Sequence, residues 1–111
     1  MGNTWVSNIL HYLDEEGEFA VKSGPARRLA EHLSAIVEAV TSRPADADWL
    51  TDIPCRRRPG RVPCIGPIIA GYQEEDPTTI VWGCPVCHDE GYISGWQETR
   101  WDKRKLYPAG K

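Results

Sequence analysis

The four cysteines of this 111-residue chain are the residues whose type and spacing could do chemistry, because thiolates are strong metal ligands. Cys84 and Cys87 form a C-x2-C pair that directly follows a strand expected to end at Trp82. Two thiolates at this spacing can reach one metal ion from a tight turn whose backbone N–H groups point at the sulfur atoms. Pro85, inside the pair, fixes one backbone dihedral angle of that turn.

Cys55 and Cys64 form a second pair, but eight residues separate them instead of the usual two to four. A loop of this length has to fold back on itself, and Pro59, Gly60 and Pro63 can supply the reversal. Zinc prefers four ligands in a tetrahedron. We therefore predict one structural Zn²⁺ held by Cys55, Cys64, Cys84 and Cys87.

Other states of the cysteines stay open at this point. Two disulfides would need an oxidising compartment, and four structural thiols without a metal are also compatible with the sequence. An iron centre is a further alternative, although the first pair lacks the C-x2-C spacing. His88 can replace one cysteine as a ligand, but a neighbour of Cys87 more often lies on the surface. We expect His11 and His32 to be ordinary residues on helix surfaces.

Four arginines lie in the loop between the first two cysteines: Arg56, Arg57, Arg58 and Arg61. A zinc ion with four thiolates has a net charge of −2, which nearby guanidinium groups would offset. The same arginines can contact phosphates, with Trp82, Tyr92, Trp96 and Trp101 as stacking platforms for bases. The sequence pI of 5.6 argues against strong nucleic-acid binding, and packing around a small metal site is the more common role for the tryptophans.

An enzymatic function is not expected. A catalytic zinc keeps an open coordination position, whereas four cysteines close the shell. Asp89 and Glu90 stand beside the second pair, where a general base could lie, but we expect them to belong to a solvated turn. The sequence has no Gly-rich phosphate loop, paired His motif or Ser-His-Asp order.

Two apolar helix faces precede the cysteines. The first has the spacing i, i+3, i+4 and i+7 and consists of Val6, Ile9, Leu10 and Leu13. The second begins near Pro25, ends before Pro44 and consists of Leu29, Leu33, Ile36, Val37 and Val40. We expect an antiparallel helical hairpin over about residues 4–42, followed by a linker over residues 44–54.

After Cys55 the pattern favours β structure. Two strands are expected over Cys64–Tyr72 and Thr78–Trp82, joined by the polar turn of residues 73–77, and a third over Tyr92–Trp96. The predicted fold class is α+β, with an N-terminal helical hairpin followed by a zinc-ribbon-like antiparallel β module. The predicted domains are residues 1–54, the hairpin and linker, and residues 55–111, the module with an irregular basic tail.

The region from Cys55 to about Trp96 resembles a zinc ribbon, in which two ligand pairs lie at opposite ends of a β-hairpin. Residues 84–91 are also similar to the cysteine-rich repeats of J-domain chaperones, where C-x-x-C is followed by x-G-x-G. Gly91 matches the second glycine of that repeat, but Asp89 replaces the first. One half-repeat does not imply a chaperone. The chain as a whole resembles small uncharacterised bacterial proteins, which implies no activity.

Charge and hydropathy complete the sequence-based expectations. Residues 1–54 have a net charge of −5 and residues 55–111 a net charge of +2, so the cysteine-bearing half is mildly basic. No membrane-spanning run or signal peptide is recognisable, so we expect a cytoplasmic protein. The predicted function is that of a structural zinc protein acting as an adaptor for an unknown protein partner. The alternative is a nucleic-acid-binding accessory protein that uses the Arg56–Arg61 loop.

Overall fold

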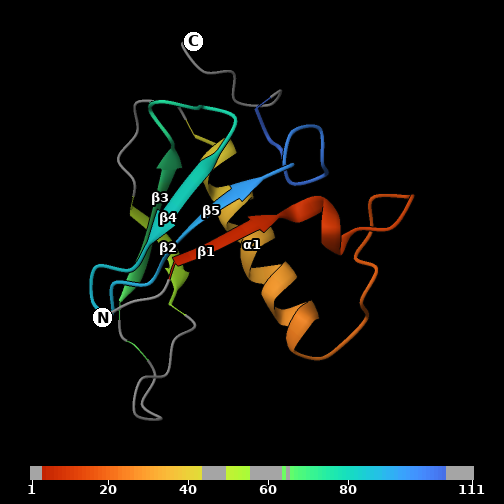
Figure 1. Cartoon of the computed structure of the whole chain (residues 1–111), viewed down its shortest axis with the longest axis horizontal. Coiled ribbons are helices and arrows are strands. Elements are labelled where there is room, and N and C mark those ends of the chain that lie inside the picture. Colours follow the sequence, from red (N-terminus) through yellow and green to blue (C-terminus); the bar gives the residue numbers. More distant parts are fainter. Residues whose placement is uncertain (1–3, 44–49, 56–63, 65, 105–111) are drawn as a thin grey trace.

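The computed structural model describes residues 4–43, 50–55, 64 and 66–104. Within these residues the chain forms five strands, one α-helix and a short 3₁₀ helix. In chain order they are β1 (Thr4–Asn8), η1 (Ile9–Tyr12), α1 (Pro25–Thr41), β2 (Leu50–Pro54), β3 (Pro67–Tyr72), β4 (Ile80–Gly83) and β5 (Glu90–Ser94). The strands form one sheet in the order β1-β5-β4-β3-β2, in which β1 runs parallel to β5 and all other neighbours are antiparallel (Figure 1).

The predicted N-terminal helical hairpin is wrong, and with it the predicted fold class. Residues 4–8 form a strand at the edge of a mixed sheet, so α1 has no helical partner of comparable length among the described residues. Of the four apolar residues that suggested a first helix, Ile9 alone is buried, while Val6 is 82% exposed. β-branched and aromatic residues at positions 4–6 suit a strand, and pairing with β5 overrides the short helical pattern.

The second predicted helix is confirmed as α1. Pro25 occupies its first turn, where the missing N–H costs nothing, and Arg27 and Glu31 form an i, i+4 ion pair on its outer side. Four of the five residues in the predicted apolar stripe are buried, and Leu29 is partly buried against the same core. The helix therefore uses its stripe to cover the sheet rather than a second helix.

The strands expected after Cys55 are present as β3, β4 and β5, with ends shifted by up to three residues. The linker prediction fails over residues 50–54, which form β2 and pair with β3. Trp49 lies outside the described residues. Because the core combines Ile9 and α1 residues with strand residues such as Ile68 and Ile93, elements from both halves pack together. The predicted domain division at residue 54 stays a prediction.

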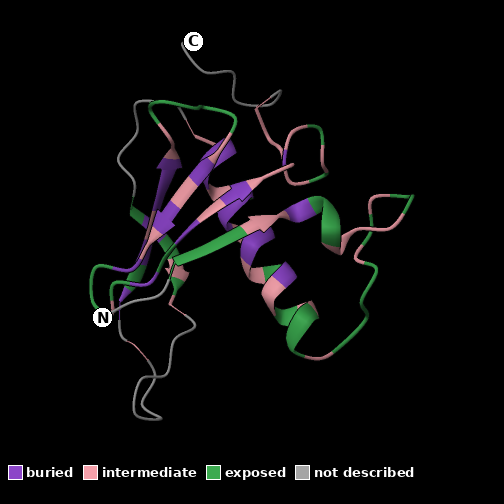
Figure 2. Cartoon of the chain, in the orientation of Figure 1, coloured by how far each residue is buried: buried purple, intermediate pink, exposed green. Residues whose placement is uncertain are grey.

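One face of the sheet is covered by α1, and Figure 2 shows buried residues on the helix and on β3, β4 and β5. In a strand, alternate side chains point to the same face, and residues in register across strands share it. Trp5 pairs with Gly91, and Gly91 pairs with Trp82, so the two tryptophans lie on the same face of three adjacent strands. A side chain at Gly91 would collide with the Trp82 indole, which explains why glycine is needed there.

The opposite, outer face of the sheet is also partly apolar. Val6, Tyr92 and Val81 lie in register across β1, β5 and β4, and Leu50 pairs with Ile69 on β2 and β3. Val6 is 82% exposed and Leu50 57% exposed. No described helix is long and apolar enough to cross a membrane.

Residues 95–104 form turns that close the end of the core. Trp96 is buried, and its indole N–H donates to Thr78 O at 2.9 Å. The buried Thr41 hydroxyl accepts from Lys103 N at 2.9 Å and lies 3.0 Å from Trp101 O and 2.8 Å from Val37 O, two carbonyls to which it can donate. Thr41 thus fastens the C-terminal segment to the last turn of α1.

We expect Thr41→Val to lower the free energy of unfolding by about 1–3 kcal/mol, because it keeps the shape but leaves Lys103 N–H without its acceptor. Urea denaturation followed by far-UV circular dichroism measures this change. Thr4→Val is the matched control, since Thr4 is exposed, and should change stability by less than about 0.5 kcal/mol. Equal effects of the two exchanges would contradict the assigned role of Thr41.

Candidate metal centre

Strand direction brings the four cysteines to one end of the sheet. Cys55 directly follows β2, and Cys64 precedes β3. Cys84 directly follows β4, and Cys87 precedes β5. Because β2, β3, β4 and β5 alternate in direction, the end of one strand and the start of the next lie side by side. The two ligand pairs, which lie at opposite ends of the hairpin in the sequence, are therefore neighbours in space.

The four sulfur atoms form a compact group. All lie within 4.8 Å of one another, with Cys55 Sγ 3.6 Å from Cys87 Sγ and Cys64 Sγ 3.5 Å from Cys84 Sγ. A tetrahedral zinc with Zn–S bonds of about 2.3 Å sets its sulfur atoms about 3.8 Å apart. The close contacts join one member of each sequence pair to one of the other, as expected for a single shared centre. The described cysteines form no disulfide, so the donor set and its spacing fit one metal ion.

The turn between Cys84 and Cys87 prepares a sulfur atom for a cation. Burial raises the pKa of the Cys84 thiol, but hydrogen bonds from the backbone N–H groups of Cys87 and Val86 and from the Cys64 thiol outweigh it and lower the pKa to about 7. Burial raises the pKa of Cys87, to which the Asp89 N–H donates. Cys84 N also donates to Asp89 O at 2.8 Å, and His88 N to Cys84 O at 2.9 Å, which closes the turn. The hydrogen bonds that backbone N–H groups donate to the sulfur atoms of Cys84 and Cys87 are the arrangement predicted from the C-x2-C spacing.

Gly66 makes room for the sulfur atoms. A Cβ at this position would lie 2.6 Å from Cys84 Sγ and 2.8 Å from Val86 Cγ2, which is closer than real contacts allow. Its carbonyl accepts from Cys55 N at 3.1 Å, so the same residue holds the start of the first cysteine loop against β3. Sequence reasoning missed Gly66, because its role depends on a contact between residues 18 positions apart.

The remaining predicted site residues fall into two groups. His88 is exposed and is not part of the sulfur group; its backbone adopts a left-handed conformation with φ of 66°. The predicted polyanion-binding residues Arg56, Arg57, Arg58 and Arg61 lie outside the described residues. The assignment of the four cysteines as ligands stays a prediction, while the structure shows that they lie close enough together to hold one metal ion.

The interpretation of Asp89 as part of a solvated turn is wrong, because the residue is 7% exposed. His32 was expected to be an ordinary residue on the helix surface; it is partly buried and meets the Trp82 ring edge-on at 5.8 Å between ring centroids. The tryptophans pack, but not all of them around the cysteines. Trp82 and Trp96 are buried, yet Trp96 donates to Thr78 O in the turn at the far end of the sheet, and Trp101 stacks on Phe19 at 4.9 Å. For His32 the sequence held no signal, because Trp82, which it meets, lies 50 residues away in the chain.

Comparisons of the chain with protein families, with curated proteins and with solved structures found no match. The cysteine geometry is consistent with a zinc-ribbon-like module, and no family match supports that likeness or the likeness to J-domain chaperone repeats.

If the four cysteines hold a metal ion, Gly66→Ala should weaken its binding about 10- to 100-fold, because the added methyl group displaces the Cys84 sulfur from its position. Competition with a colorimetric zinc chelator measures the affinity. Gly83→Ala is the matched control: Gly83 directly precedes Cys84 in the chain, but a Cβ there would meet nothing closer than 3.6 Å. If both variants hold zinc as tightly as the parent, Gly66 does not shape the site.

Proposed function

We propose that this chain is a structural zinc protein in which one Zn²⁺, bound by Cys55, Cys64, Cys84 and Cys87, holds the loops at one end of the sheet. The observation that supports this is the mutual approach of four thiols within 4.8 Å, with two contacts of 3.5–3.6 Å. A tetrahedral set of four sulfur ligands is typical of zinc or of iron–sulfur centres. Zinc needs no redox partner and suits a structural role.

The proposed role of the folded protein is that of an adaptor for another protein rather than an enzyme. Four thiolates would fill all coordination positions of the zinc, which leaves none for a substrate or a water molecule. The outer face of the sheet supports an interaction role, because Val6 and Leu50 are largely exposed there beside Tyr92, Val81 and Ile69. Exposed apolar surface that spans several strands is typical of protein interaction sites.

Zinc content tests the central proposal. Protein purified without chelators should contain about one equivalent of zinc by inductively coupled plasma mass spectrometry, and Cys84→Ser should lose most of it. His88→Asn is the matched control, since it alters the neighbour of Cys87 and asparagine tolerates the left-handed backbone. We expect His88→Asn to keep a full equivalent, because its imidazole lies outside the sulfur group. Metal-free protein with four reactive thiols would refute the proposal.

The nucleic-acid alternative gains no specific support from the described residues. Arg27, Arg100 and Arg104 pair with acidic side chains, and so does Lys103, instead of forming a basic face. The Arg56–Arg61 loop is not among the described residues. Nucleic-acid binding by this loop therefore has to be tested directly.

We expect the zinc-loaded protein to show no binding to random single- or double-stranded oligonucleotides above background between about 50 and 200 mM salt. Fluorescence anisotropy measures it, and a variant with Arg56, Arg57, Arg58 and Arg61 replaced by Gln is the matched comparison. Saturable binding by the parent would favour the nucleic-acid function instead, on one condition. The slope of log affinity against log salt concentration must be flatter for the variant, by about 0.7–0.9 for each phosphate that the variant no longer neutralises.

A further inference from the structure

The free edge of β1 lacks the features by which proteins usually keep a sheet edge from pairing with another chain. Those features are charged side chains, proline, bulges or a covering element. The opposite edge, β2, has the exposed Asp52, a terminal Pro54 and an irregular register with β3. β1 reads Thr-Trp-Val-Ser-Asn, with neither charge nor proline, and pairs with β5 in unbroken register. Because Thr4, Trp5 and Val6 are exposed, this edge is open within the described part of the chain.

The direction of the backbone groups shows what this edge offers. The Ser94 hydroxyl donates to Ser7 O at 3.4 Å, so the Ser7 carbonyl points toward β5. In a strand, the N–H and C=O groups of one residue point to the same side, and those of the next residue point to the other side. The N–H and C=O groups of Val6 therefore point away from β5, as do the Thr4 carbonyl and the Asn8 N–H. These groups face the open side of β1, where a further strand can pair with them.

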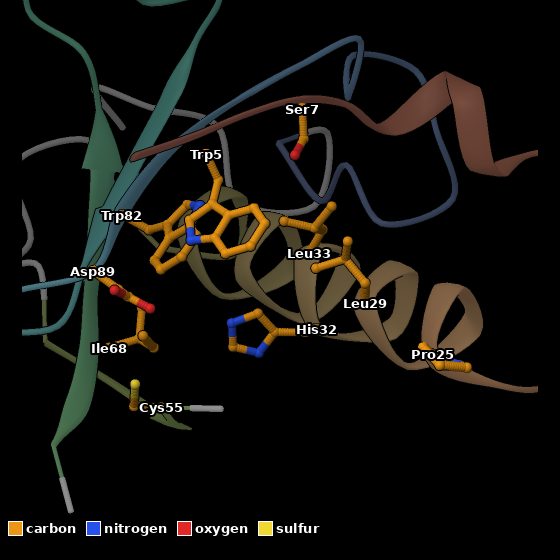
Figure 3. A pocket seen from close by; sticks show the side chains of 10 residues that line it. All are labelled: Trp5, Ser7, Pro25, Leu29, His32, Leu33, Cys55, Ile68, Trp82 and Asp89. Carbon is orange, nitrogen blue, oxygen red and sulfur yellow. The ribbon is translucent and has the colours of Figure 1, made fainter. Parts of the chain in front are cut away.

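Both faces of this edge are apolar. On the outer face, Val6 is the most exposed large apolar residue of the described chain, at 82%. On the other face, α1 packs mainly on β2, β3 and β4, so Trp5 stays 45% exposed. Trp5 and Ser7 line a cavity of about 310 Å³ between α1 and the sheet, and Figure 3 shows the Trp5 ring there. A strand added beside β1 would therefore meet apolar surface on both of its faces.

The sequence of β1 is complementary to a second copy of itself. In antiparallel pairing about a two-fold axis at Val6, this residue stands opposite its own copy, and the two exchange both hydrogen bonds. On either side of the axis, the Asn8 N–H meets the Thr4 carbonyl of the second copy. The same register places the large Trp5 ring opposite the small Ser7 side chain, at the border of the cavity. The pairing thus uses the outward backbone groups and buries the most exposed apolar side chain.

The charges beside β1 are compatible with such a pair. Glu90 is the charged residue of β5; it lies in register with Thr4 and accepts a hydrogen bond from its hydroxyl at 3.2 Å. In the two-fold pair, the row that contains Glu90 continues through Asn8 and Ser94 of the second copy. The two Glu90 carboxylates therefore lie in different rows, at opposite ends of the interface. A strand of unrelated sequence would have to lack opposing charges by chance, whereas the second copy does so by symmetry.

We propose that β1 pairs antiparallel with β1 of a second copy, so that the five strands of each copy form one continuous sheet. This dimer goes beyond the proposed metal site and does not depend on it. It joins the outer faces of the two sheets, since the row of Val6, Tyr92 and Val81 continues into the same row of the second copy. A ladder of five residues buries little area, which is typical of weak complexes, so we expect a dissociation constant of about 10–100 µM.

Sedimentation equilibrium of the protein in reducing buffer tests the proposal. Between about 5 and 500 µM the average mass should rise from the chain mass of 12.5 kDa toward twice that value. The reducing agent excludes dimers linked by disulfides. A monomer at every concentration would overturn the proposal.

Variants connect the dimer to β1. Val6→Lys should raise the dissociation constant at least about fivefold, because two like charges come to lie directly opposite each other. Leu50→Lys is the matched control, since Leu50 is 57% exposed on the outer face of the other edge strand, and should leave the dimer unchanged. Equal weakening by both exchanges would show that the outer faces pack on each other, and the proposed edge pairing would be wrong.

The register about Val6 has its own test. An equimolar mixture of Val6→Lys and Val6→Glu should associate more tightly than either variant alone, because opposite charges then meet at the axis. No gain in the mixture would rule out this register.

Amide hydrogen exchange of the parent protein, followed by NMR, decides even if an exchange at Val6 disturbs the fold. The Val6 and Asn8 amides should exchange more slowly at about 500 µM than at about 5 µM, because the second copy accepts from them. The Trp5 and Ser7 amides point toward β5 within each chain and should change much less. Exchange at Val6 and Asn8 that is independent of concentration would refute the pairing.

Discussion

The four thiols meet because β2, β3, β4 and β5 follow one another in alternating directions. In such a ladder every second connection lies at the same end, so the β2–β3 and β4–β5 connections are neighbours while the β3–β4 turn lies at the far end. Strand pairing brings the four cysteines to the same end of the sheet, but β2 and β5 are separated by β3 and β4, which is roughly 14 Å at about 4.8 Å for each strand spacing. The 3.6 Å contact between the Cys55 and Cys87 sulfur atoms therefore requires that the chain beyond the strand ends also converges.

Two glycines leave space in the sheet for side chains of the neighbouring strand. Gly66 leaves room for the Cys84 sulfur at the end of the sheet, and Gly91 leaves room for the Trp82 indole on its covered face. At each position a methyl group would lie closer to its neighbour than packed atoms can approach, so the restriction comes from volume and not from backbone angle. At the cysteine end and on the helix-covered face alike, a residue without a side chain thus leaves room for a bulky group from the next strand.

The sequence predicted the local features of this molecule better than its long-range pairings. The stripe of α1 spans five positions and was identified correctly, and so were β3, β4 and β5, within three residues, and the C-x2-C turn, whereas β2 was predicted to be a linker. The helix expected over residues 4–13 failed because its pattern was short, and because the partner that makes β1 a strand is β5, more than 80 residues away. The partial burial of His32 could not be predicted for the same physical reason: Trp82, which it meets, is brought there by the tertiary fold.

The proposed metal centre and the cavity are physically connected through two residues. Cys55 belongs to the sulfur group and also lines the cavity. Asp89 donates its backbone N–H to the Cys87 sulfur, accepts from Cys84 N, and lines the cavity as well. A shift of the cysteine turn therefore moves the acidic wall of the cavity. A metal ion that holds this turn would therefore also hold the Asp89 wall of the cavity in place. Any ligand of the cavity that prefers this position of the wall would then raise the affinity for the metal by the factor by which the metal raises the affinity for that ligand, because coupling between two binding equilibria is reciprocal.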